Sequence, residues 1–118
     1  MQIKDEFKKL IPALSVEEFK QLEQNCLAEG IREKIITWNG FIIDGHNRFE
    51  IATKHKLKFE TESKEFDSEV DAKIWMVNNQ LGTRRNLQYF VKGELMKTLE
   101  ELEKEKGLEV YKEKAVEN

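Results

Sequence analysis

The sequence has one cysteine, one proline and no long apolar segment. The lone Cys26 excludes a disulfide within the chain and favours a reducing compartment. No stretch approaches the roughly 18 apolar residues of a membrane span, and the N-terminus lacks the apolar core of a signal peptide. Neither sign of charge dominates, since 20 Lys and Arg stand against 23 Asp and Glu. We therefore expect a cytoplasmic protein without membrane contact, and not a domain whose whole surface binds nucleic acid, since such domains are usually basic.

The length of 118 residues corresponds to one domain, and 39% hydrophobic residues suffice for a compact core. Residues 2–14 show no helical period and contain the only proline, so we expect an extended segment with a short strand. Ser15 and Glu18 have the spacing of a capping box, which predicts a helix over about 16–28 that ends at Gly30. Cys26 lies on the apolar face of this helix, where we expect it to be buried and unreactive.

Asn39-Gly40 separates two runs rich in β-formers, which is the strongest short signal for a β-hairpin. The hairpin predicted over 35–43 is followed by a helix at about 46–56 and by a strand over 59–66. Ser68 and Asp71 predict a second capped helix that ends near residue 80.

A polar break at 82–86 precedes a longer helix that is predicted to begin near Asn86 and to end near residue 105. The charged residues 107–118 are compatible with a frayed helix or with a linker.

The short loop Asp44–Arg48 connects the hairpin to the next helix. Gly45 falls at a strand-to-helix turn, where the missing Cβ permits unusual φ values and a close approach of backbone to a ligand. The first amides of the following helix have no intrahelical acceptor and attract phosphate. Arg48 in the first helical turn is disfavoured by the helix dipole by about 0.3–1 kcal/mol, unless a bound anion reverses the sign. Arg84 and Arg85 repeat this pattern before the predicted helix near Asn86.

A plain structural interpretation of the same loop also exists. Asp44-Gly45 is compatible with a simple turn, with Arg48 paired to Glu50 or Glu62 at the surface. His46 fits a polar loop residue better than a metal ligand, because the second histidine of the chain makes no recognisable zinc pattern. No nucleophile–base pair is visible in the sequence.

Three ordered segments resemble the boxes of ParB N-terminal domains of the ParB/sulfiredoxin superfamily. The segment 43–52, Ile-Asp-Gly-His-Asn-Arg-Phe-Glu-Ile-Ala, resembles the second box, a Gly-x-x-Arg loop that opens a helix. The segment 14–36 is similar to the preceding helix, turn and strand, although Lys34 stands where many relatives have proline. Segment 77–87 is similar to the third box, Glu-Asn-x-x-Arg. The similarity extends over about residues 10–103 and is greatest to ParB-like proteins of phages, plasmids and integrative elements.

The resemblance implies an α+β fold with a small mixed β-sheet and packed helices. It implies a nucleotide-binding domain at 1–106 and a tail or linker at 107–118 that leads to a helix-turn-helix region outside this chain, through which the protein contacts DNA. The implied role is regulatory, in plasmid or chromosome partition or in transcription. The implied cofactors are CTP and Mg²⁺, with slow CTP hydrolysis, and a homodimer is a further implied partner.

Carried over by position, the resemblance places phosphate contacts at Gly45, His46, Asn47 and Arg48, and at Arg84 or Arg85. Asn79 is the implied magnesium ligand. Asn78 replaces the usual glutamate of the third box, which removes a carboxylate able to ligand the metal or assist hydrolysis. The resemblance therefore supports nucleotide binding more strongly than nucleotide hydrolysis.

Other activities on the same fold give the alternatives. Sulfiredoxins have a catalytic cysteine inside the Gly-x-x-Arg loop, and this loop has none. A serine-type small-molecule kinase requires a general base, for which Asp44 is the only candidate. A nuclease requires a carboxylate cluster for metal, and none is apparent. A degenerate domain that contacts protein or DNA without nucleotide is the remaining alternative.

Overall fold

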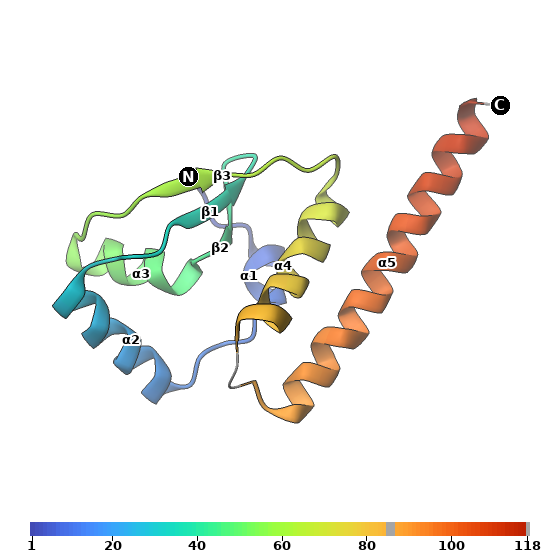
Figure 1. The fold of residues 1–118 in the computed structure, drawn as a ribbon. Coiled ribbons are helices and arrows are strands. Elements are labelled where there is room, and N and C mark those ends of the chain that lie inside the picture. Colours follow the sequence, from blue (N-terminus) through green and yellow to red (C-terminus); the bar gives the residue numbers. More distant parts are fainter. Residues whose placement is uncertain (85–86, 118) are drawn as a thin grey trace. The chain divides into compact units, whose positions relative to one another are not determined.

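The computed structural model describes residues 1–84 and 87–117, with side chains as far as residue 108. Within this part the chain is α+β, with five helices and one three-stranded mixed sheet (Figure 1). The α+β class with a small mixed sheet, expected from the sequence, is confirmed. The chain divides into two compact units, Met1–Glu65 and Phe66–Asn118. The first contains the sheet and three helices, and the second contains a pair of helices.

The helix α1 (Asp5–Leu10) occupies a segment that was expected to be extended, so this prediction was wrong. Six residues are too few to show a helical period, and tertiary packing holds them. Phe7 is fully buried, and its ring centroid lies 6.2 Å from those of both Trp38 and Phe41. The expected short strand is reduced to an isolated bridge between Gln2 and Phe41.

The helix α2 (Val16–Glu29) is confirmed together with its capping box. The Glu18 amide donates to Ser15 Oγ at 3.1 Å, and the Ser15 amide donates to Glu18 Oε1 at 3.0 Å. The helix ends at Gly30, whose φ of 82° lies in the region that favours glycine. Cys26 is 5% exposed and free, as expected.

The strands β1 (Ile35–Trp38) and β2 (Phe41–Asp44) form the predicted hairpin. Asn39 and Gly40 in its turn both have positive φ, 49° and 80°, which matches the Asn-Gly signal. The register shifts between two pairs, Thr37 with Ile42 and Ile36 with Asp44. Ile43 is therefore an extra residue on β2, and this bulge directly precedes Asp44.

The helix α3 (His46–His55) follows β2 and leads to the third strand, β3 (Thr61–Ser63), which pairs parallel to β1. The sheet order is β2-β1-β3. The strand is shorter than the predicted 59–66. Phe59, which precedes it, packs edge-on against Phe49 with ring centroids 5.8 Å apart. Eight apolar side chains form the core of this unit: Phe7, Cys26, Ile35, Trp38, Ile42, Ile43, Ile51 and Ala52.

The second unit consists of α4 (Glu69–Thr83) and α5 (Tyr89–Glu117), which pack against each other. The predicted cap is present, since the Asp71 amide donates to Ser68 Oγ at 3.2 Å. Lys106 Nζ in α5 lies 2.7 Å from Asp71 Oδ1 near the start of α4, so the helices are antiparallel. The helix α4 ends at Thr83, close to the predicted end near residue 80, and α5 begins at Tyr89, close to the predicted start near Asn86. The predicted end of α5 near residue 105 was wrong, because the helix continues to Glu117.

Among the described residues, no helix combines the length and the apolar character that crossing a membrane requires.

Candidate functional site

Gly45 connects β2 directly to α3, as the sequence predicted, and has φ 101° and ψ 23°. An added Cβ would lie 3.0 Å from Arg48 Nη2 and 3.1 Å from Ile35 Cγ1. Both the positive φ and these two contacts favour glycine over any other residue at this position. The turn thus brings the backbone of α3 close to the end of β2 without an intervening side chain.

The N-terminus of α3 has no side-chain cap and no acidic residue in its first turn. Its first intrahelical bond runs from the Phe49 amide to the Gly45 carbonyl at 2.9 Å. The amides of His46, Asn47 and Arg48 therefore have no acceptor within the helix. Together with the positive end of the helix dipole they form an environment that favours an anion.

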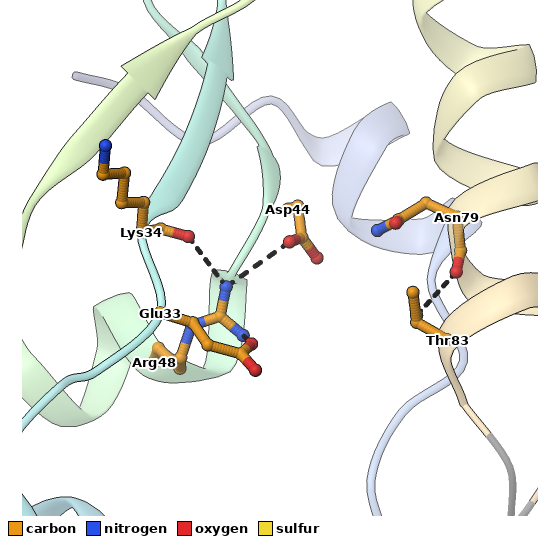
Figure 2. Close-up of polar contacts among 6 residues, drawn as sticks. All are labelled: Glu33, Lys34, Asp44, Arg48, Asn79 and Thr83. Atoms are coloured by element: carbon orange, nitrogen blue, oxygen red, sulfur yellow. Dashed lines mark hydrogen bonds and ion pairs between the residues drawn. The ribbon is translucent and has the colours of Figure 1, made fainter.

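Arg48 connects this helix end to the start of β1 and the end of β2 (Figure 2). Its Nη2 donates to the Lys34 carbonyl at 3.1 Å and to Asp44 Oδ2 at 3.4 Å, and its Nη1 donates to Glu33 Oε2 at 3.2 Å. The plain interpretation of the sequence, an ion pair of Arg48 with Glu50 or Glu62, is thus replaced by a different set of partners. The side chain of Arg48 is only 17% exposed.

Asp44 is partly buried beside Arg48. Burial raises the pKa of its carboxyl group above the ordinary value, and the neighbouring Arg48 guanidinium opposes this shift without cancelling it. A carboxyl group in this state is a better proton acceptor near neutral pH than an exposed aspartate. Asp44 therefore keeps the property required of the base candidate suggested by the sequence.

His46 is 8% exposed, and neither of its ring nitrogens has a hydrogen-bond partner among the described residues. Burial lowers the pKa of the imidazole to about 4, with a smaller contribution from the charge of Lys8. The ring is thus neutral at physiological pH. Buried polar groups are nearly always paired in folded proteins, so the two ring nitrogens of His46 call for a partner such as water, an ion or a ligand.

Three residues of the third-box segment, Asn78, Asn79 and Arg84, lie in the second unit. Asn78 is exposed and Asn79 is half-buried on α4. The Asn79 carbonyl accepts a hydrogen bond from Thr83 Oγ1 at 2.6 Å (Figure 2). Arg85 lies outside the described residues.

Arg84 does not lie directly before a helix, as the sequence suggested. It is the C-cap of α4, and α5 begins only at Tyr89. Its amide donates to the Gln80 carbonyl at 3.1 Å. A cation is favoured at a helix C-terminus by the dipole alone. Arg84 therefore needs no bound anion to explain its position, unlike Arg48 in the first turn of α3.

In the part of the chain that the structure describes, no group of three or more His, Cys, Asp or Glu side chains lies close enough together to hold a metal ion. A metal at this loop would therefore depend on ligands of other kinds, such as amide oxygens, water and the phosphates of a nucleotide.

Two features of the first unit were missed by the sequence analysis. One is the contact of Arg48 with Glu33 and Lys34, which the hairpin pairing could have indicated, because the start of β1 lies opposite the end of β2. The other is a cluster in which Glu23 Oε2 on α2 lies 2.9 Å from both Lys54 Nζ and His55 Nε2 on α3. No sequence signal marks this pairing between residues far apart in the chain.

Comparisons of this chain with protein-family models, with curated proteins and with solved structures gave no match.

Proposed function

We propose that this chain is the nucleotide-binding regulatory domain of a ParB-like DNA-binding protein, and that it binds the phosphates of CTP at the loop Gly45–Arg48. The observation that carries the proposal is the uncapped N-terminus of α3, reached through a left-handed glycine and accompanied by the unpaired His46 imidazole. Backbone amides at such a turn bind phosphate in many nucleotide-binding folds. The order of helix, hairpin, glycine loop and helix in the first unit supports the ParB-like resemblance.

The charges around the loop indicate why a magnesium ion belongs to this proposal. Arg48 is accompanied by the carboxylates of Asp44 and Glu33, and His46 is neutral. A triphosphate therefore needs additional positive charge. Mg²⁺ is commonly held by phosphates and only one or two protein ligands, so the absence of a carboxylate cluster among the described residues is compatible with it.

The remaining roles follow from the resemblance. Asn79 is the proposed protein ligand of the magnesium ion, and Arg84 or Arg85 is the proposed second phosphate contact. Asn78 in place of glutamate favours binding over hydrolysis. DNA contact is assigned to a region outside this chain, and a homodimer and a cytoplasmic location belong to the same proposal.

Calorimetric titration with CTP, ATP and GTP in the presence of Mg²⁺ tests the proposal. Asn47→Asp is the decisive variant, because a carboxylate in the first turn stabilises α3 by about 0.3–1 kcal/mol but repels phosphate. We expect affinity to fall about tenfold or more, while the unfolding midpoint stays the same or rises. Gln24→Glu, at an exposed position of α2, adds the same charge and should leave binding unchanged. No heat with any of the three nucleotides would refute the proposal.

One observation favours a second function, a domain that contacts DNA or protein without nucleotide. Both terminal nitrogens of the Arg48 guanidinium already have partners within the chain, so Arg48 serves the fold even without a ligand. This alternative predicts gel-shift retention of DNA by the full-length protein that is insensitive to nucleotide and to Asn47→Asp. The nucleotide hypothesis predicts that both change the retention.

A further inference from the structure

The two terminal nitrogens of the Arg48 guanidinium are held in different ways (Figure 2). Nη2 donates to a backbone carbonyl, that of Lys34, and to the Asp44 carboxylate, whose side chain is 24% exposed. Among the residues that the structure describes, Nη1 donates to Glu33, whose side chain is 79% exposed. One end of the guanidinium is thus fixed by the fold, and the other by a carboxylate at the surface.

The Glu33 contact is the replaceable one. Glu33 lies in the segment between α2 and β1, outside any helix or strand, and exposed ion pairs add little to stability because solvent screens them. Lys34, by contrast, contributes a main-chain atom that cannot leave without disturbing the start of β1. An anion that approaches Arg48 therefore competes with Glu33 and leaves the Nη2 contacts intact.

The Glu33 carboxylate and a ligand phosphate would bind the Arg48 guanidinium through the same kind of interaction. A carboxylate and a phosphate both accept charge-assisted hydrogen bonds from a guanidinium, and phosphate offers more charge and more oxygens. Glu33 thus makes, within the free chain, a contact of the kind that a ligand phosphate would make with Arg48.

We propose that Glu33 is a built-in competitor for the phosphate site: its carboxylate holds Nη1 of Arg48 in the free protein and is displaced when a phosphate binds. This inference rests on the proposed function of the loop. Glu33 then sets the affinity of the site without touching the bound nucleotide.

The test is a calorimetric titration of the full chain with Mg²⁺-CTP and with inorganic triphosphate. Glu33→Gln keeps the size of the side chain and removes its charge, and should tighten binding about 1.5- to 5-fold, the range expected for an exposed ion pair. Glu29→Gln is the matched control, because Glu29 makes an exposed ion pair of 3.4 Å with Arg32 and not with Arg48. It should leave the affinity unchanged.

A second measurement follows the side-chain carboxyl carbon of Glu33 by ¹³C NMR. Saturation with inorganic triphosphate should shift this resonance and leave that of Glu29 in place. If the wild-type chain binds but Glu33→Gln binds no more tightly than Glu29→Gln, the competitor role is wrong and the phosphate site stands. If none of the three chains binds either probe, the proposed function itself is refuted, and the inference with it.

Discussion

Replacing Gly45 by alanine tests the geometry on which the candidate site depends. A non-glycine residue with positive φ costs about 1–2 kcal/mol, and alanine recovers about 0.4–1 kcal/mol by restricting the unfolded chain. These two effects alone leave a net loss of about 0–1.6 kcal/mol. Gly40→Ala isolates them, because Gly40 has φ 80° and nothing lies within 4 Å of an added Cβ.

At Gly45 the added Cβ also meets Arg48 Nη2 at 3.0 Å and the fully buried Ile35 at 3.1 Å. The guanidinium must move, which weakens its bonds to the Lys34 carbonyl and to the partly buried Asp44. Loss of such bonds costs about 1–3 kcal/mol, so the total for Gly45→Ala is about 1–4.5 kcal/mol.

Urea denaturation followed by Trp38 fluorescence measures this difference. Trp75 lies in the second unit, so a Trp75→Phe background restricts the signal to the first unit. We expect a lower unfolding midpoint for Gly45→Ala than for Gly40→Ala at an unchanged slope. Equal losses for the two variants would refute the argument from the close contacts. No loss in either would refute the argument from backbone conformation.

Three further predictions concern titratable groups. Burial lowers the pKa of His46 from 6.5 to about 4, so the unfolded chain binds the proton more readily, and the free energy of unfolding should fall by about 3 kcal/mol as pH drops through this window. His46→Gln should flatten this dependence in urea titrations at pH 7 and pH 4.5. An unchanged dependence in His46→Gln would contradict the assignment. Hydrogen bonds from His55 and Lys54 lower the pKa of Glu23, so its stabilising contribution is present at neutral pH and is lost as pH falls below the ordinary carboxyl value. Glu23→Gln should therefore be less stable than wild type at pH 7, with the gap closing near pH 3 in thermal scans. Burial raises the pKa of the Cys26 thiol, so it should react with a disulfide reagent much more slowly in the native protein than in urea, and equal rates would show that it is accessible.

The elements that the sequence predicted well are those whose signals are local. The capping box at Ser15 and the cap at Ser68 each lie within one helical turn, and Asn39-Gly40 specifies its own turn. In each case a short-range hydrogen bond or a φ preference determines the structure, and the structure has the expected bond or angle.

The features that the sequence missed depend on contacts between distant segments. The helix α1 is held by Phe7 against two aromatic rings of the hairpin, and no pattern within its six residues predicts this packing. In the candidate site, the glycine turn and the position of Arg48 followed from the strand-to-helix pattern. The contact of Arg48 with Glu33 was not predicted, because it depends on the pairing of the start of β1 with the end of β2.

The parallel pairing of β3 with β1 bears on the order in which the first unit assembles and opens. The hairpin closes through a two-residue turn, whereas β3 reaches β1 only after α3 has crossed between them. Closing the longer connection costs more chain entropy, and all three residues of β3 are exposed in the native protein. The strand is thus the piece of the sheet expected to detach first in local opening, with amide hydrogens that exchange ahead of those in the hairpin. An event that loosens only β3 would leave Gly45 and the start of α3 in place, so the loop Asp44–Arg48 and the sheet edge can respond to their surroundings independently.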